Sequence, residues 1–393
     1  MTQSTPGVLM VTGVYYPEIS GASLQCRTLV AAFGDRVRCR VLTTTSSRAL
    51  PRTTEVDGVP VRRVIVDLAR PWTKLTSAVA MAWTFLRNVS RFEIVHLHGF
   101  SEKSALLMLL ARVFRKRVVV KMSSVGHDDP ISLRRRHPLL YAMFSRADRL
   151  VSISPAFAHR YAEAGLPRNR LASIPNGVDL TRFRPAVAEC REAVRHELGW
   201  ADNVPVILCV GFFSGEKQQQ TLFQAWVDSR AATGETALAF AGATSSTNDE
   251  VDPSIAARLL AKARELGLAP RIHLIEKRLD VERVYQAADL FVLPSTREGA
   301  PNVVLEAMAC GLPCIVARLR GVTDALIEDG ESGVLVDPGD TAAFAAAIAA
   351  VVRDDAFARR LGTNARNAVA RRFAIERVAD RYLDLYNGLL CAE

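Results

Sequence analysis

An alternation of short apolar runs with amphipathic stretches constrains the fold of this chain more than any other feature. The first half holds runs rich in valine and isoleucine, namely GVLMVTGVYY, CRVLTT, VRRVIV, FEIVHLH, RVVVKM and RLVSIS. Helical patterns lie between several of them, at 22–33, 75–89, 102–114 and 156–163. Because buried strands that alternate with helices belong to a parallel sheet covered on both faces, this half predicts a doubly wound α/β domain.

The pattern restarts after IPNGVDLTRFRP. The second set of predicted strands is PVILCVG, ALAFAGA, RIHLIEK, LFVLPS, PCIVA and GVLVD, and helices are predicted at 217–231, 254–267, 281–288, 302–310, 322–328 and 341–352. A chain of 393 residues exceeds one comfortable core. We therefore expect two Rossmann-like domains, 1–185 and 186–373, that face a central cleft, with the chemistry on loops that follow strands.

Composition narrows the class of protein. Hydrophobic residues make up 49% of the chain and charged residues 23%, and no apolar run approaches the ~18 residues that a membrane span needs. The opening MTQSTPGVLMVTG has no basic segment before its apolar stretch, so a cytoplasmic protein is expected. The seven cysteines are scattered, and no second Cys/His pair joins Cys310 and Cys314, so neither disulfides nor a zinc site is predicted.

The net charge of +9 is partly concentrated in RVFRKR and SLRRRHP. Such a basic patch is able to meet an anionic membrane face, a phosphorylated substrate or nucleic acid, and it is equally consistent with a solvated surface. No aromatic interleaving and no nucleic-acid motif accompany it, so a nucleic-acid partner is not expected. Peripheral contact with the inner face of a membrane is retained as a hypothesis.

Two glutamates flank a helix start in LFVLPSTREGAPNVVLEAMACGLP. Glu298 lies in the loop after a strand, Pro301 and Asn302 begin the helix, and Glu306 lies about one turn inside it. The backbone N–H groups of residues 300–304 are predicted to form an anion site, and the carboxylates to accept hydrogen bonds from hydroxyls. A sugar nucleotide carries both kinds of group. On spacing alone, two solvated glutamates explain the pattern equally well.

Three further strand–loop–helix turns carry polar residues. In VGFFSGEKQQQTL, Lys217 stands at a helix start, where a cation opposes the helix dipole and an anionic ligand would satisfy both. In GVYYPEISGASLQ, Gly21 lies at the turn, and in VKMSSVGHDDP, His127 follows a strand. A lysine that points to water explains the first equally well. His96 and His98 share one face of a strand and are predicted to pack in the sheet or line the cleft.

With these pieces assembled, the chain resembles the family 4 retaining glycosyltransferases, the group 1 glycosyl transferases with the GT-B fold. The likeness covers nearly the full length and is densest at IPNGVDLTRFRP, VERVYQAADLFVLPSTREGAPNVVLEAMACGLPCIVA and DGESGVLVDPGD. It implies an N-terminal acceptor domain, a C-terminal nucleotide-sugar donor domain and a last helix, about 374–393, that packs back on the first domain.

The resemblance also implies a role for each matching residue. Glu298 would hold hydroxyls of the donor sugar, Glu306 the ribose hydroxyls and Lys217 the diphosphate. The implied catalytic residues are Glu298, His127 and Lys217; the donor-binding residues are Gly21, Gly211, Lys217, Glu298, Gly299, Ala300, Pro301, Asn302, Val303 and Glu306; the acceptor-binding residues are Ser20, Ser124 and His127.

One position departs from the family pattern. Relatives usually carry an arginine that pairs with the diphosphate where this chain has Phe212, and Arg297 and Arg318 are examples of arginines able to substitute for it. No Asp-x-Asp motif ends a strand, so the expected reaction uses neither a metal nor a cofactor.

The implied activity is retaining transfer of a hexose-type sugar from a UDP-sugar to a glycan, lipid-linked or small-molecule hydroxyl, in cell-envelope or polysaccharide synthesis. A GT-B-like sugar-nucleotide epimerase or hydrolase and a non-catalytic binding relative are the alternatives.

Overall fold

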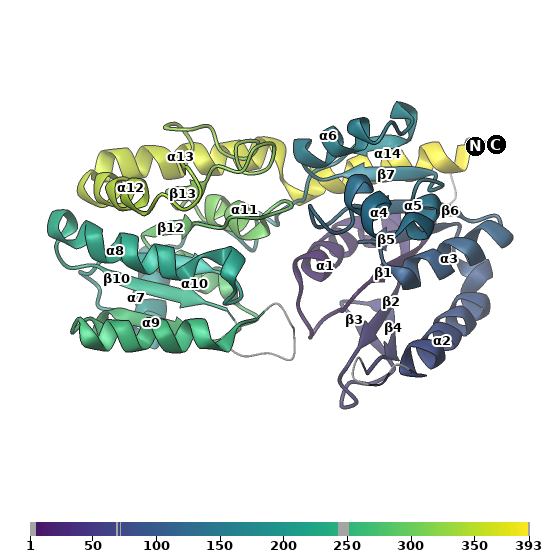
Figure 1. Ribbon diagram of the computed structural model, residues 1–393, viewed down its shortest axis with the longest axis horizontal. Coiled ribbons are helices and arrows are strands. Elements are labelled where there is room, and N and C mark those ends of the chain that lie inside the picture. The colour runs from purple at the N-terminus through teal and green to yellow at the C-terminus, as the bar shows by residue number, and fades with distance from the viewer. Residues whose placement is uncertain (1–4, 68–69, 71, 243–250, 392–393) are drawn as a thin grey trace. The chain divides into compact units, whose positions relative to one another are not determined.

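The protein consists of two compact units in a computed structural model that describes residues 5–67, 70, 72–242 and 251–391 (Figure 1). Unit 1 joins the chain up to Gly177 with the residues from Ile375 onward, and unit 2 runs from Val178 to Ala374. The first boundary between the units, after Gly177, therefore lies before the boundary at residue 185 expected from the sequence. The second, after Ala374, lies one residue beyond the expected boundary at residue 373.

An eight-stranded sheet forms the centre of unit 1. Its order is β3-β4-β2-β1-β5-β6-β7-β8, and every neighbouring pair is parallel except β3 with β4. The strands are β1 Gly7–Thr12, β2 Arg38–Thr45, β3 Thr53–Val56, β4 Val59–Ile65, β5 Ile94–His98, β6 Arg117–Lys121, β7 Arg149–Ser152 and β8 Leu171–Ser173. The six predicted apolar runs all form strands here. The short β3 and β8 escaped prediction because they lie at the edges and carry few apolar residues.

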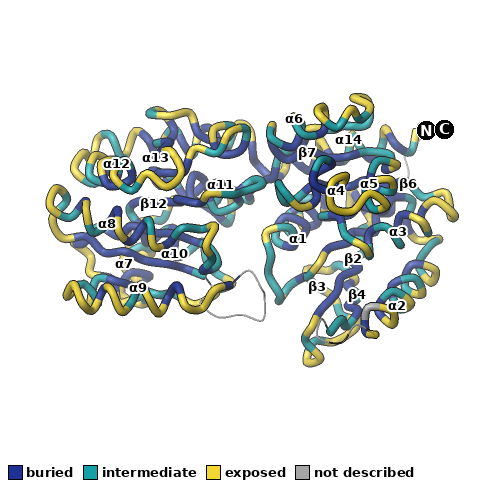
Figure 2. Tube along the Cα trace, viewed as in Figure 1, coloured by how far each residue is buried: buried dark blue, intermediate teal, exposed yellow. Residues whose placement is uncertain are grey.

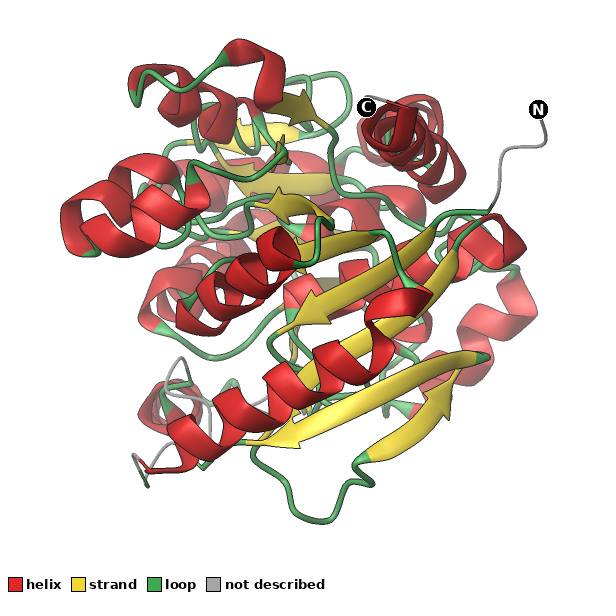
Figure 3. Cartoon of the chain, turned by 90° about the vertical axis from the view of Figure 1, so that its right-hand side faces the viewer, coloured by secondary structure: helices red, strands yellow, loops and turns green. Residues whose placement is uncertain are grey.

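Seven α-helices are described in unit 1, and helices (red) lie against its strands (yellow) in Figure 3. They are α1 Gly21–Phe33, α2 Trp72–Asn88, α3 Glu102–Val113, α4 Pro130–Arg136, α5 Pro138–Phe144, α6 Pro155–Glu163 and α14 Ile375–Cys391. The last of these belongs to unit 1 although it follows unit 2 in the chain. It packs against α1, and its Tyr382 and Tyr386 are buried in the same core as Val8 and Met10 of β1.

Unit 2 repeats this plan with six parallel strands in the order β11-β10-β9-β12-β13-β14. They are β9 Val206–Val210, β10 Ala237–Ala241, β11 Ile272–Ile275, β12 Leu290–Leu293, β13 Cys314–Ala317 and β14 Val334–Val336. The strands are among the most buried parts of the chain (Figure 2). The order runs outward in opposite directions from the neighbours β9 and β12. This point of reversal is where open α/β sheets bind ligands, beyond the carboxyl ends of the strands.

The described α-helices of unit 2 are α7 Ala188–Glu197, α8 Gln219–Thr233, α9 Pro253–Glu265, α10 Val281–Ala287, α11 Asn302–Ala309, α12 Thr341–Arg353 and α13 Asp355–Arg372. The helix expected at 322–328 is wrong, because this stretch forms successive turns. Its backbone bonds are interrupted, because Thr323 and Ile327 donate four residues back, whereas Val322 and Leu326 donate three residues back to the same two carbonyls. The Thr323 hydroxyl also donates to the carbonyl of Ala317 and accepts from the N–H of Leu319.

Candidate donor-binding site

The loops after β9 and β12 meet at the point of strand reversal in unit 2. Gly211 follows β9, and its N–H donates to the carbonyl of Ala241 in β10. A Cβ on Gly211 would touch the Lys217 side chain at 3.7 Å, and a Cβ on Gly242 would lie 2.1 Å from the Gly211 carbonyl oxygen. The ends of β9 and β10 therefore approach so closely that Gly242 tolerates no side chain, and the lysine stem lies across Gly211.

Lys217 and Glu298 form an ion pair across these loops. The Lys217 Nζ lies 2.5 Å from the Glu298 Oε1, and the side chains are 23% and 10% exposed. Lys217 does not begin the long helix, as the sequence suggested. It ends a short 3-10 turn, Gly215–Lys217, and Gln218 with φ of +55° separates that turn from α8. The left-handed Gln218 interrupts the helix, so the lysine projects from a turn.

A second set of bonds joins the same two loops. Glu216 accepts a backbone hydrogen bond from Thr296 at 2.9 Å, and its carboxylate pairs with Arg297 at 2.7 Å. The two loops are therefore held together at adjacent residues on each side, which fixes Lys217 opposite Glu298.

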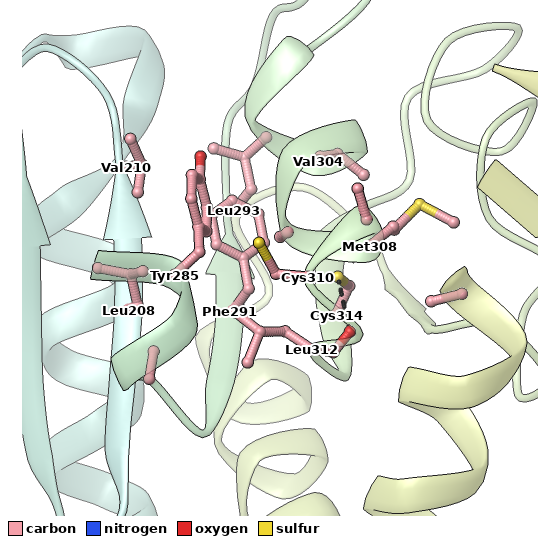
Figure 4. Packing of buried hydrophobic residues seen from close by; sticks show 14 of the residues in the cluster. Leu208, Val210, Tyr285, Phe291, Leu293, Val304, Met308, Cys310, Leu312 and Cys314 are labelled. Atoms are coloured by element: carbon pink, nitrogen blue, oxygen red, sulfur yellow. Dashed lines mark hydrogen bonds between the residues drawn. The ribbon is translucent and has the colours of Figure 1, made fainter. Parts of the chain in front are cut away.

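Glu306 occupies a different environment on α11. Its Oε2 accepts a hydrogen bond of 2.9 Å from the hydroxyl of Tyr285 on α10. Burial raises the pKa of Glu306 from 4.5 to about 7, although the bond from Tyr285 and the charge of Arg182 act in the opposite direction. Figure 4 shows Tyr285 in the apolar cluster with Leu208, Val210 and Leu293. The carboxyl group is thus bonded to a residue of that cluster and is buried, so its charged form is poorly solvated.

The turn between the glutamates offers fewer N–H groups than the sequence analysis assumed. Pro301 has no N–H, and the N–H of Val304 donates to the carbonyl of Pro301 at 3.2 Å. Pro301 is the N-cap of α11 and makes no side-chain capping bond. The expectation that all of residues 300–304 donate to an anion is therefore wrong, and the Val303 N–H and the dipole of α11 remain the features of that helix start suited to an anion. Gly299, Ala300 and Asn302 already have partners of their own.

The two arginines considered as substitutes for the arginine that Phe212 replaces both form ion pairs. Arg297 pairs with Glu216, and Arg318 pairs with Asp329, beyond β13 rather than at the strand reversal. The backbone carbonyl of Phe212 accepts from the Gln219 side chain at 2.7 Å. Arg297 is thus the one of the two candidates whose loop also carries Glu298.

The candidate acceptor residues lie in two loops of unit 1, one between β1 and α1 and one after β6. Ser20 caps α1: its hydroxyl accepts from the Ser23 N–H at 3.1 Å, and the Ser23 hydroxyl accepts from the Ser20 N–H at 2.8 Å. Gly21 begins that helix. The Ser20 hydroxyl therefore has a structural task besides any ligand.

His127 lies in the loop after β6, and its ring is exposed. Two buried aspartates shape this loop. Asp128 accepts from the N–H groups of Ser123 and Ser124, and Asp129 accepts from the N–H of Gly126. Burial raises the pKa of Asp128. The sequence indicates only that both aspartates lie in a loop, because their bonds to the backbone leave no pattern in it.

His96 packs in the sheet and against α14, within the alternatives predicted for it. Its Nδ1 lies 2.7 Å from the Tyr386 hydroxyl, and its ring stacks on that of His98, with centroids 4.3 Å apart. Burial lowers the pKa of both histidines. Both are neutral packing residues near neutral pH.

The cysteines of the chain are all free. Cys314 donates to the carbonyl of Leu312 (Figure 4). Within residues 5–67, 70, 72–242 and 251–391, no three His, Cys, Asp or Glu side chains gather as a metal-binding group. Over the same part of the chain, no helix has the length and apolarity to cross a membrane.

Two family models match most of the chain. Residues 20–177 match the glycosyl transferase 4-like domain, and residues 191–368 match the glycosyl transferases group 1 domain. The chain belongs to the group 1 glycosyltransferases. The resemblance inferred from the sequence is confirmed, and the protein is a glycosyltransferase.

Curated relatives of this glycosyltransferase have several substrates in their names. The D-inositol 3-phosphate glycosyltransferase of Nocardia farcinica is 28% identical over 93% of this chain and 83% of its own length. The UDP-Gal:alpha-D-GlcNAc-diphosphoundecaprenol alpha-1,3-galactosyltransferase of Escherichia coli is 30% identical over 55% of this chain and 54% of its own.

A solved structure with the same fold is that of Anabaena HepE in complex with UDP-glucose. It has a TM-score of 0.79 and 19% identity, over 97% of this chain and 99% of that one. This likeness confirms the predicted GT-B fold with two parallel-sheet α/β domains.

Tyr285 is the residue of the site that the sequence analysis missed. It lies in VERVYQAAD, inside a motif already recognised for the family, but it stands 21 positions from Glu306 on another helix. Its position on the buried face of α10 signals packing, and only the folded structure brings its hydroxyl to a carboxylate.

Proposed function

We propose that this glycosyltransferase transfers a hexose-type sugar from a UDP-sugar to an acceptor hydroxyl with retention of the anomeric configuration. The observation that carries the proposal is the Lys217–Glu298 pair, 2.5 Å apart beyond the carboxyl ends of β9 and β12. An ammonium group beside a carboxylate at this point suits a ligand that joins a diphosphate to a sugar rich in hydroxyls.

Each group has a task in the proposed donor complex. Lys217 exchanges Glu298 for the diphosphate, and Glu298 then accepts hydrogen bonds from the donor sugar. Glu306 holds the ribose hydroxyls, while the helix start at Ala300–Val303, with Gly299 and Gly211, borders the phosphates. In unit 1, Gly21 borders the donor, and Ser20, Ser124 and His127 contact the acceptor or the transferred sugar.

The chemistry requires stabilisation of a leaving group. The bond between the anomeric carbon and the diphosphate oxygen breaks, the acceptor oxygen bonds to that carbon on the same face, and the acceptor proton passes to the departing phosphate. Lys217 and the α11 dipole stabilise the negative charge that develops, so the proposed reaction needs neither a metal nor a cofactor. Removal of one charge-assisted bond of this kind costs about 1.5–3 kcal/mol.

The acceptor is proposed from its chemistry and from the relatives' names. Those names include a phosphorylated inositol and a diphosphoundecaprenol-linked sugar, which are both phosphate-bearing hydroxyl compounds. We place the reaction in the cytoplasm, in the synthesis of cell-envelope or other polysaccharides, with an acceptor that is a glycan, a lipid-linked sugar or a small polyol. Peripheral contact of unit 1 with an anionic membrane is part of this proposal.

The test is nucleotide release from a panel of UDP-, GDP-, ADP- and TDP-sugars, with and without acceptors that include D-inositol 3-phosphate and a lipid-linked sugar. We expect release from a UDP-sugar only when an acceptor is present, with an α-linked product from an α-linked donor. Release without an acceptor would instead identify a hydrolase or epimerase. Donor binding without release across the whole panel would identify a non-catalytic relative.

A further inference from the structure

Helix α2 of unit 1 presents its largest apolar side chains to solvent. Trp72, Leu75, Val79, Trp83 and Leu86 are between 39% and 71% exposed. Their spacing of three and four residues places them on one face of the helix. The opposite face, with Met81 and Phe85, is buried in the unit. A surface helix of a globular protein normally carries polar residues outward, so this outward face lacks an apolar partner in the described unit.

The end of the neighbouring helix α3 also exposes apolar side chains. Leu109, Val113 and Phe114 are 53%, 67% and 40% exposed. The ring of Phe114 lies 6.2 Å from that of Phe85 on α2, so the two helices are neighbours here, as Figure 1 also shows. We call the outward side chains of these two helices the α2–α3 surface, and Figure 2 colours parts of both helices as exposed.

The surroundings of the α2–α3 surface are strongly basic. From residue 68 to residue 92 the sequence contains no aspartate or glutamate. Between residues 70 and 117 it holds nine lysines and arginines and two glutamates, which account for +7 of the chain's net charge of +9. Arg87, Arg91, Arg112 and Arg115 are exposed. Each lies on or next to α2 or α3.

We infer that the α2–α3 surface docks on the headgroup region of an anionic lipid bilayer. Tryptophan prefers the boundary between hydrocarbon and water, leucine and valine enter its apolar side, and arginine is attracted to anionic headgroups. Docking of a second copy is disfavoured, because a symmetric contact would set the same cationic rims opposite each other. The role of this docking rests on the proposed function, because an enzyme bound to the bilayer would meet a lipid-linked acceptor there.

Intrinsic fluorescence gives a direct test. Of the four tryptophans, Trp200 and Trp226 are buried, and Trp72 and Trp83 lie on the α2–α3 surface. The full chain is mixed with vesicles of phosphatidylcholine alone or of phosphatidylcholine with phosphatidylglycerol. We expect a blue shift of emission and co-sedimentation with the anionic vesicles only. Absence of binding to the anionic vesicles would overturn the inference.

Variants locate the binding surface. The double variant Trp72→Gln/Trp83→Gln should lose the blue shift and most co-sedimentation, whereas Leu266→Gln, which replaces an exposed leucine of unit 2, should bind like the wild type. Substitution of Arg87 or Arg112 by Gln should weaken binding by about fivefold each, and more salt should weaken it further. Replacement of Arg371, an exposed arginine of unit 2, serves as the matched control.

Two other outcomes would also overturn the inference. Vesicle binding that the double tryptophan variant retains would assign the contact to another surface. A concentration-dependent dimer that the double variant abolishes, without vesicle binding by the wild type, would identify a second copy as the occupant. Transfer to a soluble acceptor is measured separately without vesicles. The double variant should keep it at the wild-type rate, so a failed transferase assay and a failed membrane assay remain distinct results.

Discussion

Lys217 and Glu298 partner each other, and each limits the freedom of the other. The carboxylate is 10% exposed, so few water molecules compete for it, and the ammonium is fixed by the stem that crosses Gly211. A donor that replaces this pair meets two groups already in position, which lowers the entropy cost of binding.

Glu298→Gln should lower kcat/KM for transfer by roughly tenfold to a hundredfold, because an amide replaces a charge-assisted acceptor of the sugar hydroxyls. The measurement is the initial rate with a UDP-sugar and an acceptor. Circular dichroism should show an unchanged fold. Glu265→Gln, at an exposed glutamate of the same unit, is the control and should leave the rate as it is. An unaltered rate in Glu298→Gln would remove this residue from the proposed mechanism.

Glu306→Gln should change how stability depends on pH. Because the pKa of Glu306 is about 7 in the folded protein and 4.5 normally, the folded chain retains a proton that the unfolded chain has lost. The free energy of unfolding of the wild type should therefore fall as pH rises from 4.5 to 7, by on the order of 3 kcal/mol from this group.

Glutamine has no such proton, so denaturant unfolding of Glu306→Gln should lack that part of the slope. The variant should also bind UDP more weakly, because it keeps one acceptor oxygen where the carboxylate has two. Equal pH slopes in the two proteins would contradict the raised pKa.

At the scale of elements, the ends of the strands could be predicted from the sequence, but the side-chain contacts between the loops that follow them could not. The runs LFVLPS and PVILCVG identify β12 and β9, and the parallel pattern implies that the loops after them share one edge of the sheet. Glu298 and Lys217 could therefore be placed near each other from the sequence. Their direct contact depends on the left-handed Gln218 and on the backbone bond from Thr296 to Glu216, which no periodicity encodes.

Helices were predictable where the apolar spacing continues and failed where a side chain bonds to the backbone. The predicted helix at 281–288 appears as α10 Val281–Ala287, while the stretch 322–328 forms turns in which Thr323 bonds through its side chain to the backbone of Ala317 and Leu319. The start of α11 shows the same limit: the sequence predicted the helix start at Pro301 and Asn302, but two of the five presumed N–H donors are lost to Pro301 and to the bond from Val304.

Gly242→Ala should separate the ends of β9 and β10. The new Cβ would lie 2.1 Å from the Gly211 carbonyl oxygen, and φ at Gly242 is +151°. We expect a loss of about 1–3 kcal/mol in the free energy of unfolding and weaker UDP binding, since Gly211 supports Lys217. Isothermal titration with UDP and urea unfolding measure the two effects. Gly215→Ala is the control, because its new Cβ would meet no atom within 4 Å, and it should match the wild type.

At the scale of the whole molecule, each unit has a core of its own. We expect calorimetry of the full chain to resolve two transitions. UDP at about a hundred times its dissociation constant should stabilise one of them by about 2.7 kcal/mol, because Lys217 and Glu306, the side chains proposed to hold the nucleotide, both belong to unit 2. Gly242→Ala should lower that same transition.

Tyr386→Phe should identify the unfolding transition of unit 1, because it removes the hydroxyl that lies 2.7 Å from the Nδ1 of the buried His96. It should lower the unit 1 transition by about 1–3 kcal/mol and leave the response to UDP intact. A UDP shift of the transition that Tyr386→Phe lowers would contradict the placement of the nucleotide in unit 2.

The return of α14 to unit 1 has a consequence for synthesis on the ribosome. Gln25 binds the Gly177 backbone through both atoms of its amide, and a Cβ on Gly177 would touch Ile375, so the outgoing and returning chain lie together. Unit 2 emerges complete while unit 1 still lacks the helix that covers Val8 and Met10. The half of the protein that is translated first is thus completed last. Until residue 391 has emerged, the apolar core of unit 1 stays exposed, and either chaperones or rapid completion of the chain must keep it from aggregating.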